Sequence, residues 1–238
     1  MDILDIELLL TVIITASIQS LFGIGVLLFG TPILLLLGYP FTESLLILLP
    51  ISASINLLQI SKDYRYIDKK IYKKILFLTS PFIVIFLLIV SDYHLDVSMF
   101  IGSVLIFIAL KDYVTIFNKL LNGLMYYEKI YYVSMGIIHG ITNLGGALLS
   151  AKVFHSDLDK YEKRATTAIS YMTFALFQIA TLFFLEESYD FKNLIYIAIG
   201  LLTYIVVNKL FFHKISNHKY DKLFAVFLFL SGVALLFK

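Results

Sequence analysis

The stretch Ser20-Leu21-Phe22-Gly23-Ile24-Gly25-Val26-Leu27-Leu28-Phe29-Gly30-Thr31-Pro32 interrupts an apolar run that otherwise extends from position 8 to position 37. Glycine loses backbone entropy in a helix and proline removes a hydrogen-bond donor, so this cluster is expected to break a helix. In hydrocarbon, a broken backbone is tolerated only where protein buries it or where it lines a cavity. The stretch therefore predicts a helix break at a buried or cavity-lining position.

A second glycine-rich stretch lies half a chain later: His139-Gly140-Ile141-Thr142-Asn143-Leu144-Gly145-Gly146-Ala147-Leu148-Leu149. An offset of 120 residues aligns the two, pairing Gln19 with His139 and Gly25 with Gly145. One gap later, residues 57–59 align with residues 176–178. Interrupted apolar segments at corresponding places in two halves of a chain point to a transporter binding site.

The composition is that of a membrane protein. Of the 238 residues, 60% are hydrophobic and only 15% are charged, whereas a soluble domain is nearer half apolar and a quarter charged. Outside the two broken stretches, six apolar runs are long enough to cross a bilayer, at about 20 residues each. They cover 43–60, 73–91, 97–116, 165–185, 192–208 and 222–237. We therefore expect an all-α polytopic membrane protein.

The two broken segments, 5–38 and 130–151, are interpreted as helical hairpins. Drawn as one straight helix, the first would be about 50 Å long, which is too long for a single crossing. The second has legs of about ten residues on either side of its break, or about half a bilayer each. Both are therefore expected to enter the membrane and return on the side of entry.

Charge placement predicts the topology. Seventeen of the nineteen lysines and arginines lie in the connecting segments 61–74, 111–129, 152–164 and 209–222. By the positive-inside rule these four segments are cytoplasmic. The acidic connections 92–96 and 186–190, and both chain termini, are then expected outside a cell (inner) membrane.

This topology gives the two halves of the chain opposite orientations. The first hairpin enters from outside and the second from the cytoplasm, and each is followed by three crossings. Residues 1–118 and 119–238 are therefore predicted to form an inverted repeat within one integrated membrane domain.

At the two breaks the chain resembles the sulfite exporter TauE/SafE family of membrane transporters. The residues that carry the resemblance are Phe22-Gly23-Ile24-Gly25 with Pro32, and Gly136-Ile137-Ile138-His139-Gly140 with Asn143-Leu144-Gly145-Gly146. The resemblance covers roughly residues 8–237. It implies two halves that each open with a glycine-rich broken segment, and it implies transport, often export, of sulfite, sulfonates or related organic anions. Val26 and Leu27 depart from the family's pattern, since a further glycine is common there.

The second leg of each hairpin is expected to begin with unpaired backbone amides, where the helix dipole is positive. Such a terminus binds an anion without a charged side chain, so the amides near 25–28 and 145–148 are the predicted donors. In the alternative interpretation, the glycines only allow helices to pack closely. The full set of predicted substrate-binding residues is Gly23, Gly25, Val26, Asn56, Gln59, His139, Thr142, Asn143, Gly145, Gly146 and Ser170.

Polar residues also form stripes on two of the predicted spans. One stripe consists of Ser52, Asn56 and Gln59, and the other of Thr166, Ser170 and Thr173, with Gln178 close by. The spacing of three and four residues places each set on one helix face. Such stripes line a transport path or bond neighbouring helices, and the sequence leaves both interpretations open.

His139 is the only histidine outside the predicted loops. It either titrates near neutral pH and couples transport to protons, or it is a neutral histidine bonded to a carbonyl group in the hairpin. Cysteine is absent, which excludes disulfides and thiolate metal sites. No cofactor and no metal site is predicted.

Three functions are compared. The first is a transporter of a small anion in the lipid bilayer, and the second is a membrane scaffold or assembly protein without a substrate. The third, an intramembrane enzyme, would need a nucleophile with a base, or a metal-ligand set, facing one cavity. The chain offers one embedded histidine and no clear mid-membrane carboxylate, so we expect no enzyme. The basic loop 61–74 is interpreted as an orientation signal beside anionic lipid and not as a nucleic-acid site. The sequence does not specify the oligomeric state.

Overall fold

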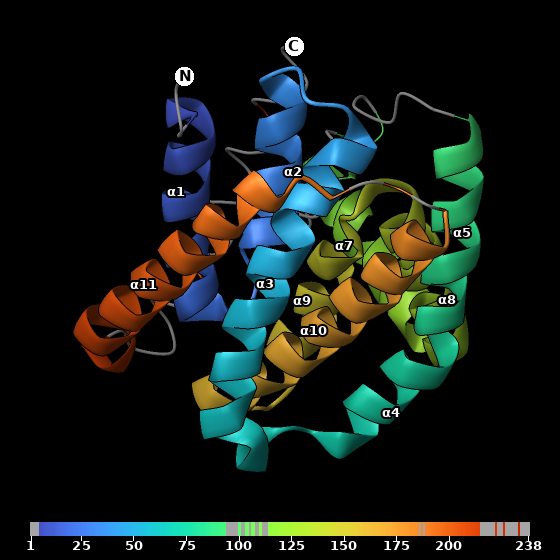
Figure 1. Ribbon diagram of the computed structural model, residues 1–238. Helices are drawn as coiled ribbons and strands as arrows, with labels where there is room; N and C mark the ends of the chain where they lie inside the picture. Colours follow the sequence, from blue (N-terminus) through green and yellow to red (C-terminus); the bar gives the residue numbers. More distant parts are fainter. Residues whose placement is uncertain are drawn as a thin grey trace.

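The computed structural model describes residues 5–93, 114–185, 187 and 189–214, together with positions 100, 103, 104, 106, 107, 110, 222, 226 and 233. Within these residues all regular structure is helical and no strand occurs (Figure 1). The all-α prediction is therefore confirmed for the described part of the chain. Most residues of the predicted spans 97–116 and 222–237 lie outside the described residues.

The chain opens with two short apolar helices, α1 (Ile6–Phe22) and α2 (Val26–Leu36). Helix α1 begins after Asp5, whose carboxylate accepts hydrogen bonds from the amides of the first turn and so satisfies donors that lack an intrahelical partner. It ends at Gly23, which adopts the left-handed conformation, φ 77°, that glycine accepts without strain. After residues 23–25, α2 runs back beside α1 (Figure 1).

A second pair of short helices has the same form. Helix α8 (Glu128–Thr142) ends at Asn143, which is also left-handed at φ 62°, and α9 (Gly145–Phe154) follows after Leu144. Asparagine is one of the few residues other than glycine that visits this conformation readily.

Both broken segments return to the end of the molecule from which they start. In the first, the Tyr39 hydroxyl, just after α2, donates to the Asp5 carboxylate at 2.5 Å. In the second, Lys152 in the last turn of α9 lies 3.5 Å from the Glu128 carboxylate at the start of α8. Each pair of legs is therefore a hairpin.

Among the described residues, four helical segments are long and apolar enough to cross a membrane, and they overlap the predicted runs 43–60, 73–91, 165–185 and 192–208. They are Phe41–Tyr66, Lys69–Ser91, Lys160–Phe184 and Phe191–Phe211. The first contains α3 (Phe41–Asp63) and η1 (Tyr64–Tyr66), the second α4 (Lys69–Leu78) and α5 (Ser80–Tyr93), the third is α10 (Lys160–Phe184), and the fourth contains η2 (Phe191–Asn193) and α11 (Leu194–Phe211). Helix α7 (Thr115–Tyr126) and the short η3 (Phe212–Lys214) complete the described elements. The chain is a multi-pass membrane protein.

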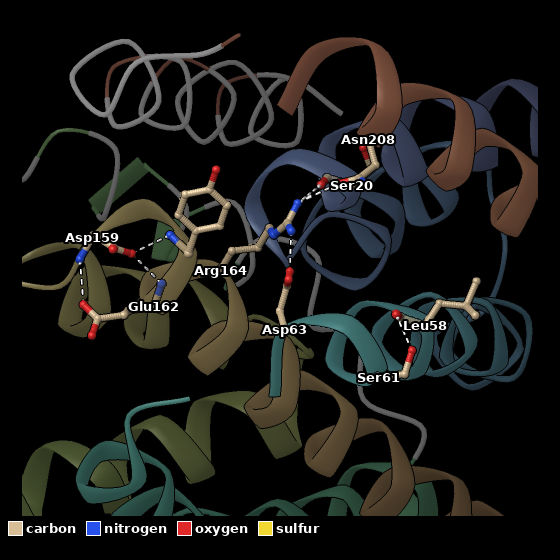
Figure 2. Close-up of polar contacts among 9 residues, drawn as sticks. Ser20, Leu58, Ser61, Asp63, Asp159, Glu162, Arg164 and Asn208 are labelled. Atoms are coloured by element: carbon tan, nitrogen blue, oxygen red, sulfur yellow. Dashed lines mark hydrogen bonds and ion pairs between the residues drawn. The ribbon is translucent and has the colours of Figure 1, made fainter. Parts of the chain in front are cut away.

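Helix α10 starts with a reciprocal cap. The Asp159 carboxylate accepts from the Tyr161 and Glu162 amides at 2.8 Å, and the Asp159 amide donates to the Glu162 carboxylate at 2.9 Å (Figure 2). This capping box satisfies amides that the first helical turn leaves unpaired. It fixes where α10 begins, four residues before Arg164.

Helices α3 and α10 pack against each other at the centre of the molecule (Figure 1). Helix α1 packs against α11 on one side, and α5 packs against α8 on the other. The first leg of each hairpin therefore packs against a membrane-crossing segment from the opposite half of the chain. The apolar core includes the residues of both breaks, because Ile24 and Leu144 are fully buried.

Candidate functional site

The first break is held by two close backbone contacts. The Gly23 amide donates to the Gln19 carbonyl at 2.9 Å and ends α1. A Cβ atom at Gly25 would collide with the backbone of Gln19 and with the carbonyl oxygen of Thr15. Glycine at position 25 is therefore required for the approach of the two legs, as the sequence indicated for a break at this place.

The second break has corresponding contacts 120 residues later. The Asn143 amide donates to the His139 carbonyl at 2.7 Å. A Cβ atom at Gly145 would collide with the His139 side chain and would lie 2.6 Å from the Met135 carbonyl oxygen. The offset that aligns the sequences thus also relates the contacts at the two breaks.

The side chain of Gln19, a residue of α1, caps the N-terminus of α2. Its side-chain oxygen accepts from the Val26 amide at 2.9 Å and from the Ser52 hydroxyl at 3.3 Å. Its side-chain nitrogen donates to the Ser52 carbonyl at 3.1 Å and to the Asn56 side-chain oxygen at 3.0 Å. The structure thus brings Val26 and Asn56 together through Gln19. We did not predict Gln19 as a site residue, although its alignment with His139 was a signal for it.

His139 lies fully buried at the second break. Its Nε2 atom is 3.2 Å from the side-chain oxygen of Gln178 in α10. Its ring lies 4.6 Å from the Phe174 ring and 5.9 Å from the Tyr171 ring, measured between centroids. The partner of His139 is therefore a side-chain amide of another helix, and not a carbonyl group within the hairpin.

Tyr171 covers the start of α9. A Cβ atom at Gly146 would overlap the Tyr171 hydroxyl, so only glycine allows this approach. The Tyr171 side chain is fully buried. Sequence reasoning missed it, because a single tyrosine in an apolar helix has no distinguishing pattern.

Asn143 connects the two hairpins. Its side-chain amide nitrogen donates to the Thr31 hydroxyl of α2 at 2.8 Å, across 112 positions of sequence. Thr142 serves the local backbone instead: its hydroxyl donates to the Ile138 carbonyl at 2.6 Å and accepts from the Leu144 amide at 3.1 Å. Of these two predicted residues, Asn143 bridges the hairpins and Thr142 caps the break.

The two remaining predicted residues are not bonded to either break. Ser170 donates to the Thr166 carbonyl at 2.6 Å within its own helix, which is the usual role of serine in a membrane helix. Gln59 is fully buried, and neither polar atom of its side-chain amide has a hydrogen-bond partner.

Several other fully buried side chains near the breaks carry a polar atom without a hydrogen-bond partner. These atoms are Asn56 Nδ2, His139 Nδ1, Asn143 Oδ1, Tyr171 Oη and Gln178 Nε2. Tyr132 and Ser150 carry such atoms elsewhere in α8 and α9. Because buried polar groups are normally paired, the five unpartnered atoms near the breaks are available to a polar ligand.

Arg164 forms a second polar cluster, whose contacts Figure 2 shows. Arg164 and its partner Asp63 belong to the basic connections 152–164 and 61–74, which mark this end of the molecule. Its guanidinium pairs with Asp63 at the end of α3, and donates to the Asn208 side-chain oxygen of α11 at 2.7 Å. It also donates to the Ser20 carbonyl of α1 at 3.4 Å and stacks 3.4 Å from the Phe212 ring. We call these five residues the Arg164 clasp.

The Arg164 clasp is buried and touches the first break. The Arg164 side chain is only 4% exposed, and a Cβ atom at Gly23 would lie 2.6 Å from the Arg164 carbonyl oxygen. In the sequence, Arg164 only ended the basic segment 152–164, so its burial was not predictable.

The opposite end holds a cavity of about 680 Å³. Polar residues of its lining include Asp5, Tyr39, Glu43, Asp190 and Lys192. The hydrogen bond from Tyr39 lowers the pKa of the Asp5 carboxyl, while burial and the neighbouring Asp5 raise the pKa of the Tyr39 hydroxyl. One end of the molecule thus holds a cavity with polar residues in its lining, and the other end holds the Arg164 clasp.

Helices broken within a multi-pass membrane protein, with their second legs starting in the buried interior, are the architecture of secondary transporters. The chain belongs to the sulfite exporter TauE/SafE family, whose model matches residues 8–235. The resemblance seen at the two glycine-rich stretches is therefore confirmed. Comparison with curated proteins and with solved structures found no match. Family membership implies a membrane transporter of sulfite-like anions, which agrees with the expectation that the chain is not an enzyme.

Proposed function

We propose that this chain exports a small anion, such as sulfite, a sulfonate or a related organic anion, across the cell (inner) membrane. The anion binds where the second legs of the hairpins begin, at the N-termini of α2 and α9. The observation that carries the proposal is the pair of matched breaks, with the Gly23 and Gly25 contacts repeated at Asn143 and Gly145. A helix N-terminus offers amide donors and a positive dipole end to an anion.

The donors at the second break are suited to transport, because they are neutral. They are backbone amides, the side-chain amides of Asn143 and Gln178, and the Tyr171 hydroxyl. A conducting site must bind strongly enough to admit its ligand and weakly enough to release it. Neutral donors meet both needs better than a buried lysine or arginine beside the anion.

An inverted repeat of residues 1–118 and 119–238 accounts for the packing of the helices. A two-fold relation between the halves exchanges α1 with α8 and α5 with α11. It therefore exchanges the α1–α11 contact with the α8–α5 contact, and it leaves α3 packed on its own counterpart α10. All three contacts are present, and such repeats rock or gate around a central site.

The positive-inside rule gives the two ends of the molecule different roles. The Arg164 clasp then lies at the cytoplasmic face. The cavity beside Asp5 and Tyr39 opens to the outside, where both chain termini also lie. In this conformation the transporter is closed toward the cytoplasm. Export requires the clasp to open so that the anion can enter from that side.

The alternative is a membrane scaffold whose glycines serve packing alone. Flux of isotope-labelled sulfite into proteoliposomes separates the two functions, comparing wild type with Gly145→Val. The matched control is Gly123→Val in α7, because a Cβ atom at Gly123 meets nothing within 4 Å. We expect Gly145→Val to abolish sulfite flux and Gly123→Val to retain it. Equal flux in all three preparations and in empty liposomes contradicts the transporter proposal.

A further inference from the structure

The N-terminus of α2 already has an acceptor from the protein itself. The Gln19 side-chain oxygen accepts a hydrogen bond from the Val26 amide, which is the first amide of α2. The same side chain is anchored at its other end, because its nitrogen donates to Ser52 and to Asn56. Gln19 is fully buried, and a ligand at α2 would have to displace an acceptor that makes four hydrogen bonds.

The N-terminus of α9 is not filled in this way. His139 stands at the position that corresponds to Gln19, but its Nε2 atom faces Gln178 and its Nδ1 atom has no partner. Neither ring nitrogen therefore accepts a hydrogen bond from the Gly146 amide, which is the counterpart of the Val26 amide in the first hairpin. The first amides of a helix have no intrahelical partner, and α9, with ten residues, is long enough to have an effective dipole.

Tyr171 supplies an independent sign of a ligand at this terminus. Its hydroxyl lies directly over Gly146, the second residue of α9. The side chain is fully buried, and the hydroxyl has no hydrogen-bond partner. A buried tyrosine hydroxyl normally finds a partner, so this one is placed to donate to a group that the protein does not provide.

We propose that the transported anion binds at the N-terminus of α9 alone, with the Tyr171 hydroxyl as its side-chain donor, and that Gln19 closes the corresponding site at α2. This inference rests on the proposed function and narrows its binding site from the two helix N-termini to one. The Gly146 amide and the Tyr171 hydroxyl can both donate to a bound group, so the site favours oxygen atoms that only accept hydrogen bonds. A sulfite ion or the sulfonate group of an organic anion meets this requirement, whereas an ammonium group does not.

The test is sulfite binding to the purified protein in detergent, measured by calorimetry and by thermal stabilisation. The key variant is Tyr171→Phe, and the matched control is Tyr132→Phe, since Tyr132 is also fully buried with an unpartnered hydroxyl but lies in α8. A hydrogen bond to a charged ligand is worth roughly tenfold or more in affinity. We expect Tyr171→Phe to weaken sulfite binding about tenfold, and Tyr132→Phe to bind like wild type.

A second variant locates the anion between the two breaks. Gln19→Ala frees the Val26 amide, so it tightens sulfite binding if the anion belongs at α2. Our proposal expects the sulfite affinity of Gln19→Ala to stay within about threefold of wild type, because α9 is unchanged. Tighter binding by Gln19→Ala, or wild-type affinity of Tyr171→Phe, overturns the inference while leaving anion transport intact. If wild type itself shows no response to sulfite or to a simple sulfonate, the proposed function fails.

Site-specific 3-fluorotyrosine keeps the hydroxyl and therefore serves as a test that does not depend on the folding of a variant. With the label at position 171, we expect sulfite to shift the fluorine resonance in a saturable way. With the label at position 132, we expect no such shift. The reverse pattern, or no shift at either position in protein that sulfite stabilises, places the anion away from Tyr171 and overturns the inference.

Discussion

Gly25 packs so closely against Gln19 that a Cβ atom at position 25 would collide with the Gln19 backbone. Gly145 stands in the same relation to His139, 120 residues later. Each hairpin thus has a glycine at the start of its second leg, and that glycine contacts a residue in the last turn of the first leg. The closest approach within each hairpin depends on the absence of one side chain.

Gly25→Ala is expected to destabilise the protein. The added Cβ atom meets backbone atoms of Gln19 and Thr15, which cannot rotate away as a side chain does. Overpacking of this kind costs about 1–3 kcal/mol. Gly123→Ala is the control, since it has open space and improves helix propensity by roughly 1 kcal/mol at most. The measurement is reversible unfolding in detergent, and equal stability of the two variants would show that the backbone at Gly25 adjusts freely.

Asp63→Asn is expected to destabilise the protein strongly at the Arg164 clasp. It removes the charge partner of Arg164, a guanidinium that is only 4% exposed. Breaking a buried ion pair by removal of one partner costs about 3–5 kcal/mol. Thermal unfolding compares it with Ser61→Ala on the same helix, because Ser61 is exposed and bonds only the Leu58 carbonyl (Figure 2). A loss as small as that of Ser61→Ala would mean that water replaces Asp63 at no cost.

The same clasp yields a prediction about conformation. Because the native chain has no cysteine, a single cysteine at Ser20 reports whether the clasp is open. We expect a maleimide reagent to react slowly with Ser20→Cys in the otherwise native chain and at least several-fold faster when Asp63→Asn is added. If both proteins react at the same rate, the clasp does not control access from that end.

The topology predicts that the two ends of the molecule face opposite sides of the membrane. Single cysteines replace Lys62 and Lys192, which are exposed at the basic end and at the end with the cavity, respectively. An impermeant thiol reagent added to intact cells should label Lys192→Cys and should reach Lys62→Cys only after lysis. Labelling of both from the same side would exclude the inverted arrangement.

His139→Gln distinguishes the two interpretations of the embedded histidine. A glutamine can donate to the Gln178 oxygen as the imidazole does, and glutamine stands at the corresponding position 19. We therefore expect His139→Gln to retain sulfite flux within about threefold, with an unchanged dependence on pH. Flux in proteoliposomes across a pH series measures this. Loss of the pH dependence with retained flux would instead assign proton coupling to His139.

The ion pair of Glu128, at the start of α8, is expected to make the folding stability of the protein depend on pH. The hydrogen bond from Lys74, at 2.5 Å, and the nearby Lys152 lower the pKa of the Glu128 carboxyl in the folded protein. A group with a lowered folded pKa stabilises the fold above its unfolded pKa, and this contribution is lost as the pH falls through the folded value. Both partners are about 40% exposed, so the contribution is at most about 1 kcal/mol.

The measurement compares unfolding of wild type and Glu128→Gln. We expect the wild type to be the more stable protein at pH 7 and the difference to disappear under acidic conditions. A difference that grows as the pH falls would contradict the sign of the effect.

Composition and apolar run length were sufficient to predict an all-α multi-pass membrane protein, and the glycine-rich stretches were sufficient for the family. These features are local: a run of about 20 apolar residues reports its environment wherever it packs. The same is true of the breaks, because Gly23 and Gly25 act on their own backbone. The sequence also paired Gln19 with His139 and Gly25 with Gly145, and the structure has corresponding contacts at both pairs.

Only the tertiary structure decided which polar groups meet. The bonds from Gln19 to Asn56, from Asn143 to Thr31, and from Arg164 to Asp63 join positions 37, 112 and 101 residues apart. No sequence period specifies such distances, since they depend on how α1, α2, α3 and the later helices pack. The glycine-rich stretch at 20–32 thus predicted a break by its own chemistry. That Gln19 fills the resulting helix terminus, while the terminus at Gly146 faces Tyr171, follows only from the packing of α3 and α10 around the two hairpins.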